Sequence, residues 1–487
     1  MSATAGTLRS SCREERAVVA CRVASPWVTA VVTLAADSLA VALAGCLAVE
    51  FWSLVNRSVH AESYVQLWPA TFVFLAAYAM LGLYPGVGLS PVEELRQSVM
   101  STSLVYLVGS ASIVLTRDTG FSRGVFLGGW ALSVVFVPVF RSGLRHFCAA
   151  RSWWGVPVLV LGAGAAGRTV VARLRATPGL GLKPVAFLDD DADKELDYDG
   201  VPVAGPLAMA ADLGRRLHIH YALVAMPSLK RQALLEVLER GGTAFSHLIV
   251  LPDLFGMASL WVSACDLGGV LGLEVRQNLL SPVNRRLKRA LDLLLALTAG
   301  ALALPLLAAA VIWIKRVSPG SAFYEQERGG EAGHAIRVHK LRTMRPDADA
   351  LLEKHLERNP EARREWARYF KLKNDPRLLP GIGRLLRRTS LDELPQLWNV
   401  IRGEMSLVGP RPFPDYHLSQ FSGEFRSLRA RVLPGVTGLW QVSARSDGDL
   451  TVQQSLDTYY IRNWSLWLDL HILARTVRAV LLRQGAW

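Results

Sequence analysis

The stretch that organises this chain runs Thr389-Ser-Leu-Asp-Glu-Leu-Pro-Gln-Leu-Trp-Asn-Val-Ile-Arg-Gly-Glu-Met-Ser-Leu-Val-Gly-Pro-Arg-Pro412. Two neighbouring carboxylates, Asp392 and Glu393, stand where a helix is expected to begin, and a Gly-Pro-Arg-Pro turn follows a short apolar segment. Carboxylate oxygens bind hard cations, and a free carboxylate can attack phosphorus as a nucleophile. The pair therefore predicts a site at which a metal ion and a phosphate meet.

A structural interpretation of the same residues stands beside the catalytic one. Ser390 and Glu393 have the spacing of a capping box, in which two side chains accept hydrogen bonds from free amides at a helix N-terminus. Capping boxes are common, so the two interpretations are about equally favoured by this stretch alone. Pro395 favours the catalytic one slightly, because a proline just past the first turn costs a hydrogen bond inside the helix.

Further motifs stand on both sides of this stretch. They are Lys340-Leu-Arg-Thr-Met344, Lys371-Leu-Lys-Asn-Asp-Pro-Arg377, Leu433-Pro-Gly-Val-Thr-Gly-Leu-Trp-Gln-Val-Ser443 and Tyr460-Ile-Arg-Asn-Trp-Ser465. Together with the carboxylate pair, they resemble the bacterial polyprenyl-phosphate hexose-1-phosphate transferases, which start the assembly of O-antigen, capsule and exopolysaccharide. The whole chain resembles the long form of that family, and most closely its galactose-transferring members.

The resemblance implies a reaction and roles for the two acids. Hexose 1-phosphate is expected to pass from a UDP-hexose to undecaprenyl phosphate, with release of UMP. Asp392 would attack the β-phosphate and carry the sugar phosphate in a ping-pong cycle, while Glu393, with Asp392 beside it, would hold Mg²⁺. Galactose is the expected sugar from the whole-chain similarity. Glucose is the alternative, because the motifs do not report the one hydroxyl by which the two sugars differ.

Cationic and polar side chains near the acids are the expected substrate contacts. The planar fork of arginine matches two phosphate oxygens at once, which makes arginine a good phosphate ligand. The residues selected are Lys340, Arg342, Arg387 and Arg411, with Thr437 and Gln441 as further contacts and Gln326 and Arg328 as weaker candidates. For Arg387, the adjacent Arg388 leaves a solvated run of charge as an equally good account of one of the two.

The composition limits the class of protein. A chain of 487 residues is too long for one core, so two or three units are expected. The net charge is +13 and the mean hydropathy is +0.25, a combination that favours anionic lipid or acidic substrates over nucleic acid. Five scattered cysteines without a C-x-x-C pair argue against a disulfide framework or a zinc site.

Four apolar stretches predict membrane-spanning helices near the front of the chain. Residues 27–52, 65–83, 99–115 and 125–140 each approach the roughly 20 residues that a bilayer requires. Arginines gather before the first stretch and after the fourth. The positive-inside rule therefore predicts a cytoplasmic tail over 1–24 and a four-helix transmembrane region over 25–150 that begins and ends in the cytoplasm. Asp37 lies inside the first stretch, where a packing or hydrogen-bonding role between helices is favoured.

Residues 151–280 are predicted to form a cytoplasmic Rossmann-like domain around a parallel sheet. Val156-Pro-Val-Leu-Val-Leu161 has the composition of a buried strand, and Gly162-Ala-Gly-Ala-Ala-Gly167 follows before a helix. The next strand ends in Asp189, at the distance typical of a ribose contact. Gly162, Gly164 and Gly167 are possible nucleotide contacts, or they serve only the tight turn and helix packing.

Redox chemistry in this domain is a remote alternative. Neither Tyr198 nor Tyr221 is followed by a lysine four residues later, so the Tyr/Lys pair of nucleotide-sugar dehydratases is missing. A regulatory scaffold without catalysis is a second remote alternative, and the Asp392/Glu393 pair speaks against it.

Residues 281–487 are predicted to form a mostly helical catalytic domain that begins with an apolar run over about 288–316. Both ends of the run are strongly basic, and Pro305 interrupts it. An ordinary fifth span would put the two cytoplasmic domains on opposite sides, so a re-entrant hairpin that breaks at Pro305 is favoured. The expected protein is therefore a multi-pass bacterial inner-membrane protein with both domains on the cytoplasmic face. The family resemblance also implies a homodimer.

Overall fold

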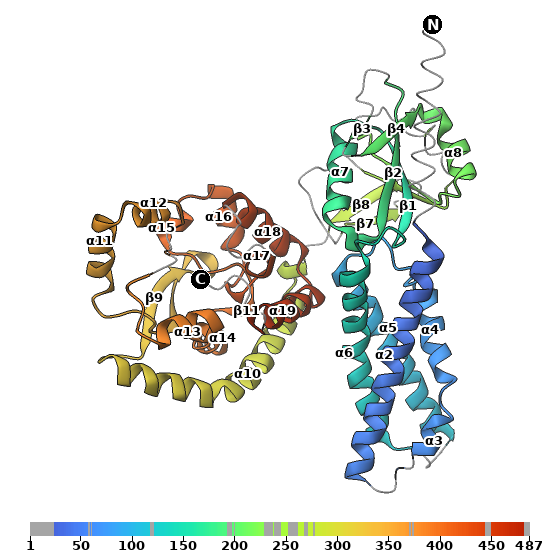
Figure 1. Ribbon diagram of the computed structural model, residues 1–487. Coiled ribbons are helices and arrows are strands. Elements are labelled where there is room, and N and C mark those ends of the chain that lie inside the picture. Colours follow the sequence, from blue (N-terminus) through green and yellow to red (C-terminus); the bar gives the residue numbers. More distant parts are fainter. Residues whose placement is uncertain are drawn as a thin grey trace. The chain divides into compact units, whose positions relative to one another are not determined.

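The structure is a computed structural model of the chain, drawn in Figure 1. It describes residues 24–56, 59, 61–116, 121–191, 197–198, 200–227, 237, 245–251, 262–266, 271–275, 278–369, 372, 375–443 and 450–481. Two compact units, Met1–Met257 and Ala258–Trp487, are each described by themselves. Of the predicted cytoplasmic tail, all but the last residue lies outside the described part.

The first unit begins with a helical bundle. Its helices are α2 (Pro26–Val55), α3 (Ala61–Val65), α4 (Ala70–Met80), α5 (Pro91–Thr116) and α6 (Arg123–Cys148). Each of the four predicted apolar stretches therefore contains helix. By length and composition α2 and α6 can cross a membrane, and α4 is a shorter apolar helix. The number of crossings remains a prediction.

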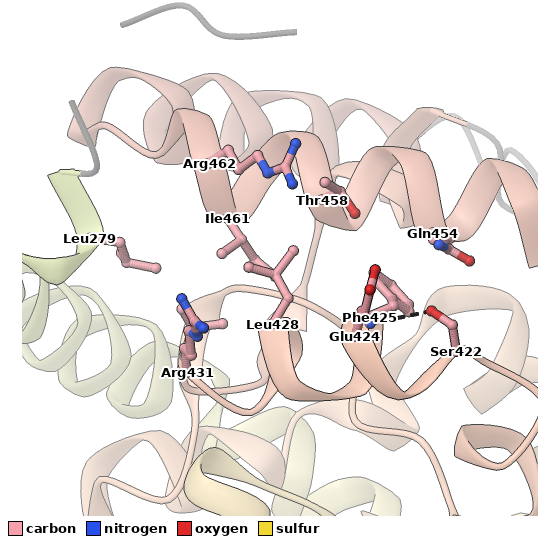
Figure 2. Close-up of a pocket in the computed structure, with 11 residues that line it drawn as sticks. Leu279, Ser422, Glu424, Phe425, Leu428, Arg431, Gln454, Thr458, Ile461 and Arg462 are labelled. Carbon is pink, nitrogen blue, oxygen red and sulfur yellow. Dashed lines mark hydrogen bonds between the residues drawn. The ribbon is translucent and has the colours of Figure 1, made fainter. Parts of the chain in front are cut away.

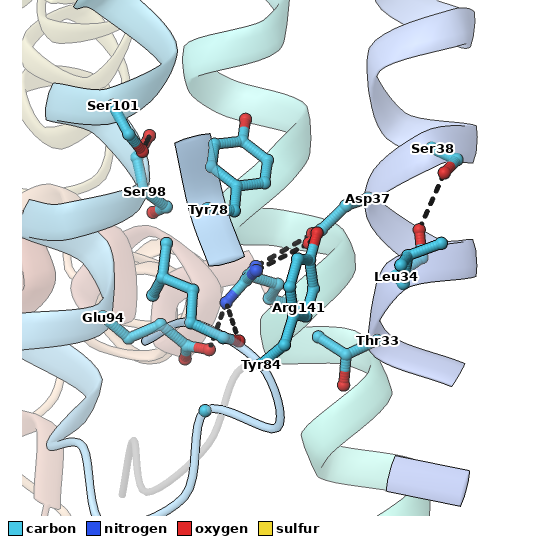
Figure 3. Close-up of polar contacts among 12 residues, drawn as sticks. Thr33, Leu34, Asp37, Ser38, Tyr78, Tyr84, Glu94, Ser98, Ser101 and Arg141 are labelled. Carbon is cyan, nitrogen blue, oxygen red and sulfur yellow. Dashed lines mark hydrogen bonds and ion pairs between the residues drawn. The ribbon is translucent and has the colours of Figure 1, made fainter. Parts of the chain in front are cut away.

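A buried ion-pair network joins these helices, as Figure 3 shows. The Asp37 carboxylate on α2 is fully buried and accepts hydrogen bonds from Arg141 Nε (2.8 Å) and Nη2 (2.6 Å) on α6. The Tyr84 hydroxyl donates to the same carboxylate at 2.6 Å, and Arg141 Nη1 donates to Glu94 on α5 at 3.2 Å. The hydrogen-bonding role predicted for Asp37 is confirmed, since one arginine ties three helices together through two acids.

A six-stranded sheet completes the first unit. Its strands are β1 (Val156–Leu161), β2 (Leu182–Leu188), β3 (Asp197–Tyr198), β4 (Val201–Gly205), β5 (Tyr221–Val224) and β6 (His247–Val250), in the spatial order β3-β4-β2-β1-β5-β6. Only β3 pairs antiparallel. The helices around the sheet are α7 (Ala165–Ala176), α8 (Ala210–Arg216), η1 (Pro178–Leu180) and η2 (Leu207–Met209). Every residue of β1 is buried, as its unbroken apolar sequence predicted.

The three glycines after β1 differ in what surrounds them. Gly162 has φ +104°, and a Cβ there would lie 2.4 Å from Met226 Cγ; a Cβ on Gly167 would lie 2.1 Å from the Gly162 carbonyl oxygen. Gly164 has open space instead. The Asp189 carboxylate, expected to contact a ribose, accepts the Ala163 N–H at 2.7 Å. Turn geometry and close helix packing therefore account for Gly162 and Gly167, and nucleotide binding remains a prediction.

The second unit is mostly helical with short strand pairs. Its strands are β7 (Val262–Asp266), β8 (Leu271–Val275), β9 (Phe323–Gly329), β10 (Ala335–Leu341), β11 (Ser406–Val408) and β12 (Gly435–Thr437). Its α-helices are α10 (Pro282–Val317), α11 (Ala348–Arg358), α12 (Pro360–Tyr369), α13 (Ile382–Thr389), α14 (Gln396–Arg402), α15 (Asp415–Leu418), α16 (Gly423–Arg429), α17 (Leu439–Ser443), α18 (Leu450–Asn463) and α19 (Leu466–Leu481). The 3-10 turns are η3 (Asn278–Leu280), η4 (Glu331–Gly333) and η5 (Leu391–Glu393). The β7–β8 pair is antiparallel and lies outside the six-stranded sheet.

The apolar run predicted to form a broken hairpin is one helix. α10 is continuous from Pro282 to Val317 with Pro305 inside it, and it changes direction along its length in Figure 1. Proline removes one backbone donor and bends a helix without having to end it. Pro305 therefore does not interrupt the helix, and the course of α10 through a membrane remains a prediction.

Candidate active site

The two acids lie on a tight turn between two helices. α13 ends at Thr389, and Ser390 takes the left-handed conformation (φ 56°) that closes it. The acids follow in the single 3-10 turn η5, and Pro395 stands immediately before α14. Ser390 makes no side-chain capping bond, so the capping-box interpretation is wrong. Pro395 precedes the helix and costs it no interior hydrogen bond, which removes the argument drawn from that residue.

Two cations hold Glu393. Its Oε1 accepts a hydrogen bond from Lys340 Nζ at 2.8 Å and another from Arg411 Nη2 at 2.8 Å. Lys340 comes from β10, and Arg411 from the turn after β11. Burial raises the pKa of Glu393, but the charges and hydrogen bonds of Arg411 and Lys340 outweigh it and hold this pKa well below its usual range. Glu393 is thus fixed as an anion.

Asp392 has a different environment. Among the described residues, none makes a hydrogen bond or salt bridge to its carboxylate. Burial and the negative charge of Glu393 raise the pKa of Asp392 to about 6, against the opposing charges of Lys340, Arg387 and Arg411. Two adjacent acids whose pKa values are pushed apart have separate roles. Asp392 is thus the acid of the pair that no described side chain holds.

The structure distinguishes Arg387 from its neighbour. Arg387 Nε donates to Thr343 Oγ1 at 3.2 Å, and its Nη1 lies 3.8 Å from Asp375, which Arg377 holds at 2.7 Å. Burial lowers the pKa of Arg387, and Asp375 and Asp392 oppose that shift. Arg388 is exposed and has no hydrogen-bonded or ion-paired partner in the part of the chain that the structure describes. Arg387 is therefore the arginine of the two whose charge interacts with Asp392.

Three selected residues are engaged elsewhere. Arg342 Nη2 donates to the carbonyls of Ser318 (3.1 Å) and Pro319 (2.9 Å), just past the C-terminal end of α10. The Thr437 hydroxyl shares a 2.8 Å hydrogen bond with Thr476, and Gln441 Nε2 donates to the Val436 carbonyl at 3.1 Å. The Thr437 carbonyl accepts the N–H of Gly409 at 2.9 Å, so its backbone positions the Arg411 turn. Direct substrate contact by these three side chains remains a prediction.

The basic start of α10 supports the strand that leads into Arg411. The sequence alone did not predict this role. Buried Lys288 donates to the Val408 carbonyl at 3.0 Å and to Asp469 at 2.6 Å. Asp292, one turn further, accepts from Ser406 Oγ at 2.7 Å and from the Leu407 N–H at 3.2 Å. These contacts hold all of β11, the strand that leads into Arg411. The signal in the sequence that could have indicated this role is the position of Asp292, an acid, inside an apolar run.

A second buried ion pair supports the same turn from the other direction. Arg429 Nη1 donates to Asp457 at 2.9 Å, and Nη2 donates to the Arg411 carbonyl. The Arg429 guanidinium lies 4.5 Å from the centre of the Phe413 ring. Burial raises the pKa of Asp457 to about 6, and the charge of Arg429 opposes this. Arg429 therefore positions Arg411 through its backbone.

The donor set fits Mg²⁺ shared with a substrate. Magnesium is usually bound by one or two carboxylates, with waters and substrate phosphates completing its shell. Asp392 and Glu393 supply two carboxylates, and their mutual repulsion is one cause of the raised pKa of Asp392. Within the described ranges no group of three or more His, Cys, Asp or Glu residues could hold a metal alone. These two residues suit a metal that also binds phosphate oxygens.

Comparison with known sequences gives this site its family. The bacterial sugar transferase model matches residues 283–483, which include the acids and all the cations around them. A CoA-binding domain model matches residues 79–250, which include the six-stranded sheet.

Several curated relatives match most of the chain, and three of them are described here. The undecaprenyl-phosphate galactose phosphotransferase of Salmonella typhimurium is 32% identical over 397 residues, 81% of this chain and 82% of that protein. The UDP-galactose-lipid carrier transferase of Erwinia amylovora is 34% identical over 401 residues, with 81% and 82% covered. The UDP-glucose:undecaprenyl-phosphate glucose-1-phosphate transferase of Escherichia coli K12 is 29% identical over 411 residues, with 82% and 84% covered. Since the similarity extends through both units and over the carboxylate turn, this chain belongs to the bacterial sugar transferase family.

Proposed function

We propose that this protein transfers hexose 1-phosphate from a UDP-hexose to undecaprenyl phosphate and releases UMP. The observation that carries the proposal is the asymmetry of the acid pair. Glu393 is held by Lys340 and Arg411 at 2.8 Å each, whereas Asp392 has a pKa of about 6. A carboxylate that is ionised at neutral pH and surrounded by phosphate-binding cations suits nucleophilic attack on phosphorus.

The proposed reaction has two displacements at one phosphorus atom. A carboxylate oxygen of Asp392 attacks the β-phosphorus, the bond to the bridging oxygen breaks, and UMP leaves with the electron pair. The product is a sugar-phosphoryl aspartate. A phosphate oxygen of the lipid then attacks the same phosphorus, the acyl-phosphate bond breaks, and the Asp392 carboxylate is restored. Undecaprenyl-diphosphate-hexose is released, and no oxidant or other reactant is needed.

The residues around Asp392 have separate tasks in this proposal. Arg387 and Arg411 hold phosphate oxygens near the nucleophile, since guanidinium groups bind them in two hydrogen bonds. Lys340 keeps Glu393 ionised and adds a positive charge beside the leaving group. Glu393 and Asp392 would hold Mg²⁺, which when bound supplies positive charge against the diphosphate.

Galactose is the proposed sugar, with glucose as the alternative. Of the three relatives described above, which match most of the chain, the two named for galactose are 34% and 32% identical and the one named for glucose is 29% identical. The reaction would be the first membrane step in making O-antigen, capsule or exopolysaccharide. It would occur at the cytoplasmic face of the bacterial inner membrane, with α10 re-entrant, the other apolar helices spanning, and a homodimer as the assembly.

The test is UMP release by the full-length protein from a panel of UDP-sugars, with undecaprenyl phosphate and Mg²⁺. One UDP-hexose should release UMP faster than the others, and Asp392→Asn should abolish release with every donor. Asp415→Asn, which makes the same change at an exposed acid, is the matched control and should be fully active. Full activity of Asp392→Asn, or no UMP from any donor, would refute the proposal.

A further inference from the structure

An open pocket of about 370 Å³ lies in the second unit between α16 and α18, beside η3 (Figure 2). One wall is apolar, with Phe425 and Leu428 of α16 near Ile461 of α18, and Leu279 of η3 lies at one end. A pocket of this size holds a small ligand or part of a larger one. None of the lining residues belongs to the carboxylate site, so the pocket needs an explanation of its own.

Two arginines make one end of this pocket positive. Figure 2 shows Arg431 and Arg462 at the end where Leu279 lies, and Glu424 at the opposite end. Both arginines are exposed, and among the described residues neither guanidinium has a salt bridge or a side-chain hydrogen bond. Their donors are therefore available to an anion beside an apolar wall.

The positive end is also close to the start of α10. Leu279 stands three positions before Pro282, where α10 begins, and three residues span at most about 11 Å. Val283 and Leu287 in the first turns of α10 are 69% and 49% exposed, and the helix is apolar and long enough to cross a membrane. The pocket therefore lies within reach of the start of a helix that is apolar and long enough to cross a membrane.

We propose that this pocket binds the phosphate headgroup of an anionic membrane phospholipid. Arg431 and Arg462 hold the phosphate, and the first methylene groups of the lipid lie against Phe425, Leu428 and Ile461. A soluble anion has no need of the apolar wall, and a zwitterionic lipid brings a cation toward the two arginines. Anionic lipids of the cytoplasmic leaflet attract basic residues that lie close to a membrane surface. The proposal does not depend on the transfer reaction, because the pocket shares no residue with the acids.

The test is native mass spectrometry of the full-length protein in detergent, titrated with phosphatidylglycerol or with phosphatidylcholine of the same chain length. The wild type should bind phosphatidylglycerol more tightly. Arg431→Glu/Arg462→Glu should weaken that binding by about tenfold or more, whereas Arg431→Lys/Arg462→Lys should keep most of it. Leu428→Trp, which fills the pocket without changing charge, should also weaken it.

The control variant is Arg426→Glu/Arg478→Glu, which makes the same charge change at two exposed positions outside the pocket. It should bind phosphatidylglycerol as the wild type does. UMP release by the Arg431/Arg462 variants should be unchanged, which shows that they are folded. Three results would overturn the proposal: equal binding of the two lipids, equal loss in the control variant, or displacement by undecaprenyl phosphate or inorganic phosphate at lower concentration than phosphatidylglycerol.

Discussion

Arg411 Nη2 donates a 2.8 Å hydrogen bond to Glu393 Oε1, and this contact joins the turn after β11 to the turn that carries the acids. Lys340 donates to the same oxygen from β10. The Glu393 carboxylate oxygen therefore connects its own turn to β10 and to the turn after β11, next to Asp392. Glu393, the acid that binds both cations, has the lowered pKa, and Asp392 beside it has the raised one.

The first prediction concerns Arg411. Arg411→Ala should lower kcat/KM for UMP release by about 10²-fold, because preorganised charge at a reacting phosphate is lost and Glu393 keeps only Lys340. Arg411→Lys should recover little, since an ammonium group cannot form the two parallel hydrogen bonds of a guanidinium. Arg426→Ala, at an exposed position on α16, is the control. A loss smaller than about threefold in Arg411→Ala would remove the residue from the site.

The second prediction is a pH dependence. In the proposed mechanism Asp392 must be ionised to attack, and burial together with the charge of Glu393 raises its pKa to about 6. The kcat/KM for UMP release should therefore be constant above pH 7. Well below about pH 6 it should fall tenfold for each unit of pH. Glu393→Gln removes the neighbouring negative charge, so the midpoint of whatever activity remains should move to lower pH. A midpoint that stays in place would show that another group controls the profile.

The third prediction tests the support given by α10. Lys288→Met leaves the buried Asp469 without its cation, and breaking a buried pair costs about 3–5 kcal/mol of stability. Unfolding by denaturant should show that loss, together with slower UMP release, because the Val408 carbonyl also loses a donor. Arg286→Met makes the same change at an exposed position of the same helix. Equal stability of the two variants would contradict the role assigned to Lys288.

The fourth prediction concerns the helical bundle. Asp37→Ala leaves Arg141, which is 1% exposed, with Glu94 as its remaining acid, so the bundle should lose about 3–5 kcal/mol. Thermal unfolding in detergent measures the effect. Ser38→Ala is the control, because Ser38 is partly exposed and its hydroxyl bonds only within its own helix. A midpoint for Asp37→Ala equal to that of the control would show that the network adds nothing to stability.

Local sequence patterns were sufficient to predict some elements of the structure but not others. β1 was predicted with its observed bounds, because a short apolar run that is followed by Gly162 is typical of a buried strand. The spacing of Ser390 and Glu393 in the sequence is equally compatible with a capping box and with a Glu393 that is held by cations. The outcome depends on Lys340 and Arg411, which lie 53 and 18 positions away from Glu393.

The role of α10 was hidden for a similar reason. Lys288 matches the basic flank that any membrane helix carries, and its burial depends on Asp469, which lies 181 positions away. Pro305 predicts a bend but does not decide between a bend and a break, because neighbouring packing determines how far the freed carbonyl is accommodated.

The proposed mechanism requires that Asp392 becomes covalently attached to the sugar phosphate. The most direct measurement is a single turnover with UDP-hexose and Mg²⁺ in the absence of undecaprenyl phosphate, using a donor labelled in the sugar. We expect a burst of UMP that approaches one equivalent per active site, with the label bound to a peptide that contains Asp392. No burst and no label until the lipid phosphate is added would contradict it and would indicate direct transfer from donor to lipid.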